Sequence, residues 1–306
     1  MKAIKIACAL VFGAFCCLSD SSQGKTGALY DNTYKAETSA SAFPERHSQV
    51  SQQLFLGVGK KQALIVGLGG SEGGNPWASN YWKVQRDRFI EQGFAVLALG
   101  YFGTKDSPAK LDRIALEGIH AAVMQAAQTP GVNAECIIVM GGSRGGELAL
   151  LLGSQYKEYD AVIGIVAGSS IFPALTMSMD TPGWSHHGKL FPFVPVNEAS
   201  YPALLRRDLR AAFSAMMEDR IAMEKAAIAV ESINGPVMFL SAQKDEMWPS
   251  TEMSEMMVSR LKSKNFTFPV KHIAIDGNHS APLKHFSFIE EFLQQELRQS
   301  KPECAL

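Results

Sequence analysis

A five-residue motif, Gly-Gly-Ser-Arg-Gly at 141–145, constrains the fold of this 306-residue chain more than any other feature. An apolar run suited to a strand, 136–140, leads into the motif, and an apolar run suited to a helix, 147–152, follows it. Glycines on both sides of the serine allow a helix and a strand to approach closely, and the sharp turn between them raises the serine hydroxyl above the sheet edge. The motif therefore predicts a strand, a tight turn and a helix, with Ser143 as a candidate nucleophile.

The segments on both sides of this motif alternate between strand-like and helix-like patterns. Strands are predicted at 53–58, 63–68, 94–99, 136–140, 161–167, 236–240 and 270–275, with a short turn joining the first two, and helices at 80–92, 111–122, 250–264 and 289–297. Strands that are apolar on both faces are typical of a parallel sheet covered by helices on each side. We therefore predict an α/β fold with a mostly parallel, doubly wound sheet, in which ligands bind beyond the carboxyl ends of the strands.

Composition excludes some classes of partner. The formal net charge is −1, with 29 Lys and Arg spread among 30 Asp and Glu, and no long run of one sign is present. This balance argues against a nucleic-acid-binding surface. A hydrophobic content of 46% is enough for a full core. We assign residues 51–300 to one domain and 301–306 to a tail; the sequence does not indicate an oligomeric state.

The first residues have the pattern of a secretion signal. Lys2 and Lys5 precede a short apolar stretch, 6–15, and a polar run follows. The stretch is too short to span a bilayer, so we predict a cleaved signal peptide at 1–22, a leader at 23–50, an exported protein and no stable membrane span. A short buried helix fits less well because no amphipathic period is visible. A bacterial lipoprotein is disfavoured because Phe15 stands where a small residue is expected before Cys16.

Cysteine usage does not indicate a disulfide framework. Three cysteines lie within the predicted signal, which leaves Cys136 and Cys304 in the mature chain. We expect Cys136 to be a small buried apolar residue of a strand, and Cys304 to lie in a tail that frays. Whether Cys136 and Cys304 form a disulfide after export stays open.

Two loops further along the chain carry the partners that a serine nucleophile requires. A serine hydroxyl needs a base to take its proton and a carboxylate to orient that base, and in this kind of fold they follow in the order serine, acid, histidine. Asp245 follows the strand at 236–240, with Glu246 as the neighbouring alternative. His279 follows the strand at 270–275, whereas His47, His120, His272 and His285 fall in the leader, in helices or in a strand.

Acyl transfer also needs N–H donors for the negative charge that develops on the carbonyl oxygen. The backbone N–H of Arg144, directly after the nucleophile, is the first candidate. A second donor is expected from the glycine-rich loop 69–74 after an early strand, where Gly70 and Ser71 are the candidates. This loop lacks the residues of a nucleotide-binding pattern, and we expect no cofactor.

Four stretches together resemble one family: 69–74, 93–103, 141–152 and 235–250. They are similar to the catalytic domain shared by acyl-CoA thioesterases and bile acid-CoA:amino acid N-acyltransferase, in the dienelactone-hydrolase-like group of α/β-hydrolases. The resemblance covers about 53–298 and implies an α/β-hydrolase fold in which Ser143 is the nucleophile, Asp245 the acid and His279 the base. Better-known members carry a β-sandwich domain before the hydrolase, whereas only the leader precedes residue 51 here.

The region 169–233 is predicted to be a cap insertion that governs substrate choice. It begins with an apolar, proline-punctuated stretch and continues as a helical run at 201–230. We expect Phe172 and Trp184 to contact substrate in an acyl pocket; the alternative is that such residues only cover the sheet edge. His186 and His187 are adjacent but have no patterned carboxylate nearby in the sequence, so no metal site is predicted.

The sequence thus predicts a serine hydrolase that cleaves a small-molecule ester or thioester through an acyl-enzyme. An acyltransferase that passes the acyl group to an amine or alcohol would use the same residues. A non-catalytic exported scaffold that binds lipid or a partner is the competing class. Because acyl-CoA is a cytoplasmic metabolite that an exported enzyme would rarely meet, the family resemblance carries over the fold and the three residues but not the substrate.

Overall fold

The computed structural model describes residues 43–304. The predicted signal peptide, 1–22, and most of the predicted leader lie outside the described residues. Within the described part of the chain, no helix combines the length and the apolar character needed to cross a membrane.

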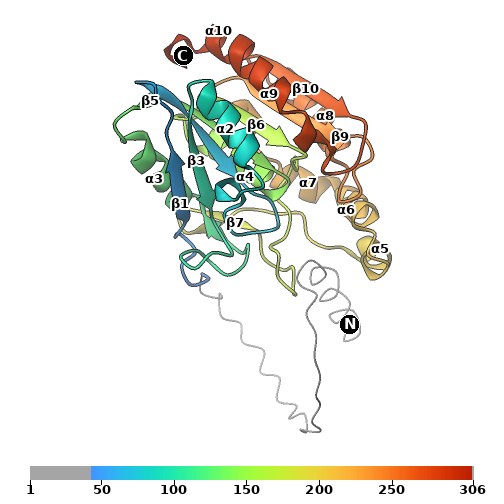
Figure 1. The fold of residues 1–306 in the computed structure, drawn as a ribbon. Helices are drawn as coiled ribbons and strands as arrows, with labels where there is room; N and C mark the ends of the chain where they lie inside the picture. Colours follow the sequence, from blue (N-terminus) through green and yellow to red (C-terminus); the bar gives the residue numbers. More distant parts are fainter. Residues whose placement is uncertain (1–42, 305–306) are drawn as a thin grey trace.

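A seven-stranded sheet forms the centre of the molecule (Figure 1). Its strands lie in the order β1-β3-β2-β5-β6-β9-β10, and every neighbouring pair is parallel except β1 with β3. The strands are β1 (Ser51–Phe55), β2 (Gln62–Leu68), β3 (Ala95–Gly100), β5 (Val132–Gly142), β6 (Ala161–Ile165), β9 (Val237–Ala242) and β10 (Val270–Ile275). The strand predicted at 53–58 ends at Phe55, a loop at 56–61 joins it to β2 in place of the short turn, and β1 pairs with β3 rather than with β2.

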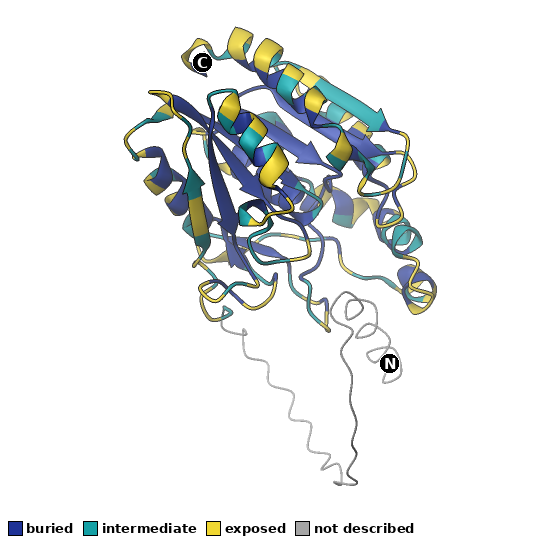
Figure 2. Cartoon of the chain, in the orientation of Figure 1, coloured by how far each residue is buried: buried dark blue, intermediate teal, exposed yellow. Residues whose placement is uncertain are grey.

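Helices cover both faces of this sheet, as the all-apolar strands predict. Alternate residues of β2 point to opposite faces: Leu64 and Val66 pack with α3 (Leu116–Ala127), α4 (Arg144–Gln155) and α8 (Ser250–Ser263). Ala63 and Ile65 pack with α2 (Lys83–Glu91) and α9 (Phe286–Phe292). Figure 2 shows the inner strands buried, the edge strands β1 and β10 only partly buried, and helices whose outer faces are exposed. The chain therefore has the doubly wound α/β fold.

Two predicted helices begin or break differently. The helix predicted at 111–122 begins only at Leu116, because the preceding residues form β4 (Ile114–Ala115) of a second, small sheet with β7 (Trp184–His186) and β8 (Lys189–Leu190). The helical run at 201–230 is divided into α5 (Tyr201–Leu205), α6 (Leu209–Met217) and α7 (Arg220–Ala226). Asp208 and Asp219 cap α6 and α7, since their side chains accept backbone N–H groups at the helix starts. Apolar residues recur at helical spacing across these breaks, so the sequence pattern predicts one continuous helical run.

The C-terminal segment is held in place, contrary to expectation. A π-helical turn (Leu293–Leu297) and α10 (Arg298–Ser300) continue α9, and Cys304 then forms a disulfide with Cys136 of β5, with a Cα–Cα distance of 5.1 Å. Both cysteines are buried. The prediction of a fraying tail is therefore wrong, whereas Cys136 is the buried strand residue that was expected, and the bond that the sequence left open is present. Their separation of 168 residues explains why local sequence patterns did not pair them.

Replacing Cys304 with serine is expected to lower the free energy of unfolding by about 2–5 kcal/mol, because the disulfide closes a long loop in the unfolded chain. Urea unfolding of the wild type and of Cys304→Ser, each with and without dithiothreitol, measures this. Reductant should destabilise the wild type to the level of the variant and leave the variant unchanged. A wild type whose urea midpoint does not respond to reductant, under conditions where mass spectrometry shows two free thiols, would contradict the expectation.

Candidate active site

Ser143 occupies the turn between β5 and α4, at the carboxyl end of a central strand. Its backbone is strained, with φ 55° and ψ −119°, a conformation that is rare for residues other than glycine. Its N–H donates to the carbonyl of Ile165 at the end of neighbouring β6, at 2.8 Å. The predicted strand, sharp turn and helix are therefore present, and they hold Ser143 at the edge where ligands bind in such sheets.

Two glycines of the motif allow this turn to be so tight. A Cβ atom on Gly141 would lie 2.1 Å from the carbonyl oxygen of Gly145, and a Cβ on Gly145 would lie 2.1 Å from the carbonyl oxygen of Gly69. Both distances are far below any real contact and involve backbone atoms that cannot move aside. Helix α4 therefore packs directly on β5 and on the glycine-rich loop only because these positions lack side chains.

Asp245 and His279 come together at the ends of β9 and β10. Asp245 is fully buried, and its Oδ1 lies 2.8 Å from Nδ1 of His279, whose side chain is 19% exposed. The backbone N–H groups of Met247 and Trp248 also donate to Asp245 Oδ1. Glu246, the alternative acid, instead accepts the backbone N–H of His279. Asp245, rather than Glu246, is therefore the carboxylate in contact with the imidazole, and Glu246 holds the backbone of the loop that carries His279.

No hydrogen bond joins Ser143 to His279 among the described residues, but a short chain of contacts links their surroundings. Trp248, which follows Asp245, donates its indole N–H to the carbonyl of Val166 at 2.9 Å. Val166 lies directly after β6, next to the residue that accepts from Ser143, and has a positive φ of 42°. The Trp248 ring lies 6.3 Å from the His279 ring. The sequence did not predict Trp248 or Val166 as site residues. The available signal was Trp248 itself, because it comes directly after the acid loop and a buried indole N–H needs a hydrogen-bond partner.

The predicted oxyanion loop lies against Ser143. A Cβ on Gly70 would meet the Ser143 Cβ at 3.3 Å, so the two backbones are neighbours. The Gly70 N–H, however, donates to the Glu72 carboxylate at 3.0 Å. Ser71 is exposed on the following turn. Arg144, as the first residue of α4, has a backbone N–H that the helix itself does not use.

Beneath the elbow lies a buried network that the sequence did not reveal. The Arg144 guanidinium pairs with Glu147 at 2.9 Å and donates to the carbonyls of Phe172 and Pro173. The other Glu147 oxygen accepts the indole N–H of Trp184 at 2.5 Å. Burial raises the pKa of Glu147 to about 7, although Arg144 and Trp184 act in the opposite direction. The network fastens the region after β6 to the helix that carries Ser143.

The raised pKa of Glu147 makes stability depend on pH. The carboxyl of Glu147 keeps its proton up to about pH 7 in the folded protein, whereas in the unfolded chain it loses the proton near the ordinary pKa of 4.5. The stabilisation that comes from this tighter proton binding is therefore complete below pH 4.5 and is lost as the pH rises through 7. Relative to Glu147→Gln, which cannot ionise, the wild type is expected to lose about 3 kcal/mol of unfolding free energy over that interval. Urea unfolding of both proteins at pH 5 and pH 8 measures this. A difference between them that does not change with pH would refute it.

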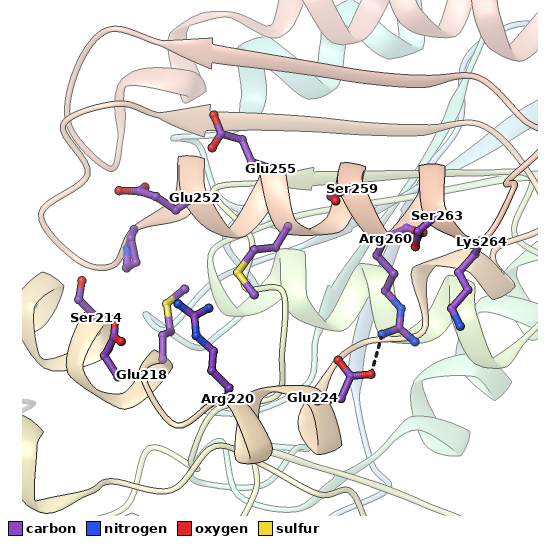
Figure 3. Close-up of a pocket in the computed structure, with 13 residues that line it drawn as sticks. Ser214, Glu218, Arg220, Glu224, Glu252, Glu255, Ser259, Arg260, Ser263 and Lys264 are labelled. Atoms are coloured by element: carbon purple, nitrogen blue, oxygen red, sulfur yellow. Dashed lines mark hydrogen bonds and ion pairs between the residues drawn. The ribbon is translucent and has the colours of Figure 1, made fainter.

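Trp184 and Phe172, the predicted substrate contacts, are both fully buried. Trp184 belongs to the network under the elbow, and Phe172 packs with residues of α6, α7 and α8 and with Trp248. A cavity of about 740 Å³ lies among α6, α7 and α8 (Figure 3). It includes charged residues such as Arg220 and the ion-paired Glu224 and Arg260, and none of Ser143, Phe172 or Trp184 lines it. Both aromatic residues therefore support neighbouring elements in this structure.

Comparison with known proteins places this geometry in context. Residues 114–279 match the family model described as BAAT / Acyl-CoA thioester hydrolase C terminal. Acyl-coenzyme A thioesterase 6 of Mus musculus is 27% identical over 225 residues, which are 72% of this chain and 49% of the relative. Acyl-coenzyme A amino acid N-acyltransferase 1 of the same organism is 24% identical over 251 residues, 76% of this chain and 56% of the relative. The chain thus spans about half the length of these relatives.

Solved structures share the fold at low sequence identity. An acylaminoacyl peptidase of Pyrococcus horikoshii has a TM-score of 0.59 at 15% identity, over 81% of this chain and 39% of the peptidase. Est1E of Butyrivibrio proteoclasticus, solved with ferulic acid bound, has a TM-score of 0.53 at 17% identity, over 84% of this chain and 99% of Est1E. These likenesses bear on the fold alone, which is that of the α/β-hydrolases.

Proposed function

Because the chain belongs to the BAAT / acyl-CoA thioester hydrolase C-terminal family, we propose that it hydrolyses an ester or thioester through Ser143, Asp245 and His279. One observation carries the proposal: the buried carboxylate of Asp245, after β9, lies 2.8 Å from Nδ1 of His279, after β10. Both strands belong to the sheet whose central strand β5 ends at the strained Ser143. Three residue types required for acyl transfer thus come from three distant loops at one edge of the sheet.

Each residue has a defined task in this mechanism. Asp245 accepts a hydrogen bond from the Nδ1–H of His279, which leaves Nε2 unprotonated and able to take the proton of the Ser143 hydroxyl as its oxygen attacks the carbonyl carbon. The resulting imidazolium then gives that proton to the leaving alcohol or thiol. Water, deprotonated by the same imidazole, releases the acid from the acyl-enzyme and restores Ser143.

The negative oxygen of the tetrahedral intermediate requires donors beside Ser143. The N–H of Arg144 and the N–H of Gly70 are the proposed pair. Since Glu72 accepts the Gly70 N–H in the present conformation, binding of the substrate oxygen must displace that carboxylate. The hydroxyl of Tyr101 donates to the Gly69 carbonyl at 2.6 Å and keeps the start of this loop in place while Glu72 moves.

The test is a substrate panel. p-Nitrophenyl esters and acyl-CoAs of matched acyl-chain length are compared for kcat/KM, and the products are identified with and without an amine or alcohol acceptor. Saturable release of free acid in the absence of acceptor supports the hydrolase. Product formation that depends on the acceptor would replace it by the acyltransferase, and no turnover of either series would favour the binding scaffold.

We also propose that the mature protein is exported. The support is the leader pattern in the sequence together with the Cys136–Cys304 disulfide, a bond that persists in oxidising compartments. Fractionation of cells that express the full chain, with intact-mass measurement of the product, tests this. Uncleaved protein in the cytoplasm would contradict it.

A further inference from the structure

Three potential metal ligands meet at the side of α3, away from the residues proposed for catalysis. Glu117 lies in the first turn of α3, His186 is the last residue of β7, and His187 follows it in the turn to β8. The potential ligand atoms of Glu117, His186 and His187, one from each residue, all lie within 4.8 Å of one another. The sequence predicted no metal site at His186 and His187 because no patterned carboxylate lies near them in the chain. The fold supplies that carboxylate from a distant helix.

The turn between β7 and β8 directs His187 toward this carboxylate. His186 pairs with Lys189 across the hairpin, which leaves His187 and Gly188 as a two-residue turn with φ of 50° and 68°. Asparagine or glycine usually occupies the first position of such a turn. Here a histidine holds it, its backbone N–H donates to Glu117 Oε1, and its Nδ1 lies 3.5 Å from the same oxygen.

Two of the ligand-bearing side chains hold polar atoms without a partner. Glu117 Oε2 and His186 Nε2 are both buried and make no hydrogen bond within the described chain. The buried hydroxyl of Tyr156, whose ring lies 5.5 Å from that of His186, has no partner either. Buried polar groups nearly always have partners, so several unpartnered atoms at one place indicate a bound ion or water.

We propose that Glu117, His186 and His187 bind one divalent transition-metal ion, with Zn²⁺ as the best match. Two imidazoles and one carboxylate are the ligands that zinc takes, with a fourth position left to water, whereas Mg²⁺ and Ca²⁺ prefer oxygen ligands throughout. The second group of potential ligands in the described residues contains Cys136 and Cys304, which the disulfide already uses.

The ion would fasten β7 to α3. Trp184, at the start of β7, holds Glu147 beneath the elbow, so the metal secures one end of a strand whose other end supports the nucleophile-bearing helix. Its role is structural, and it does not take part in the proposed proton transfers. Stability, rather than catalysis, is therefore the property that metal binding is expected to change.

Titration calorimetry on the folded, disulfide-bonded protein tests the site. After treatment with EDTA and its removal, the wild type is titrated with ZnCl2 and, separately, with MgCl2. One Zn²⁺ per chain is expected, and no saturable Mg²⁺ binding. His187→Ala and Glu117→Gln should each weaken Zn²⁺ binding by at least about tenfold. Loss of a residue that only hydrogen-bonds to a metal ligand already lowers affinity by about that factor, and loss of a ligand itself should lower it at least as much. His285→Ala and Glu91→Gln are the matched controls and should bind like the wild type, because His285 precedes α9 and Glu91 ends α2, on the opposite face of the sheet from α3.

Thermal unfolding gives a second readout that needs no enzymatic activity. Zn²⁺ at a hundredfold excess over its Kd should raise the melting temperature of the wild type by about 5 °C, and should not raise that of His187→Ala. Circular dichroism establishes that both variants fold; His187 is exposed, so its removal should be tolerated. Absence of saturable Zn²⁺ binding, or binding that is equal in the wild type and both ligand variants, would overturn the proposal and leave water as the partner of the buried atoms.

Discussion

Replacing Ser143 with alanine is expected to lower kcat for ester or thioester hydrolysis by at least about 10⁴-fold, because no other group can form the acyl-enzyme. The loss should appear in kcat with any substrate that the wild type turns over. Stability should change little, since no hydrogen bond of the Ser143 hydroxyl is among the described contacts. Steady-state kinetics and a thermal melt of the same preparations measure the two effects.

Ser154→Ala provides the matched control for this result. Ser154 lies on the same helix, is buried and, within the part of the chain that the structure describes, donates only to the Leu151 carbonyl, so loss of its hydroxyl should leave kcat unchanged. Retention of more than about a tenth of the wild-type kcat in Ser143→Ala would show that hydrolysis does not depend on this serine.

Replacing Asp245 with asparagine is expected to lower kcat by about 10³–10⁴-fold, because the amide no longer stabilises the imidazolium or fixes the tautomer of His279. The neighbouring Glu246→Gln is the control. Among the described residues Glu246 accepts a hydrogen bond only from the backbone N–H of His279, so its neutralisation should lower kcat less than about tenfold. Kinetics of both variants against the same substrate decide between the two carboxylates.

The outcome that contradicts this assignment is a larger loss in Glu246→Gln than in Asp245→Asn. Because Asp245 also accepts the N–H groups of Met247 and Trp248, a melt of Asp245→Asn must accompany the kinetics. A variant that melts like the wild type but fails in turnover separates the catalytic role from the structural one.

The parts of this molecule that follow local rules could be predicted from the sequence. All-apolar runs became the parallel strands, and the glycines around Ser143 became the tight turn, because hydrophobic period and glycine sterics act over a few residues. The order of loops along the chain then identified Asp245 and His279, since the carboxyl ends of parallel strands lie at one edge of the sheet.

What the sequence did not reveal depends on residues far apart in the chain. Neither Cys136 nor Cys304 indicates its partner, and the pairing of β1 with β3 depends on sheet order rather than on the intervening turn. Trp184 looked like a substrate contact because it is large and apolar, but its indole N–H meets the buried Glu147. Glu117 has no local pattern that links it to His187. Each of these contacts is set by tertiary packing.

Labelling of the folded protein with a fluorophosphonate probe tests the central claim most directly. The probe reacts with a serine only where a neighbouring base activates its hydroxyl. We predict a single adduct, located on Ser143 by peptide mass spectrometry, that is absent in heat-unfolded protein and strongly reduced in Asp245→Asn. No adduct on the folded wild type, or an adduct on a different serine, would contradict the account.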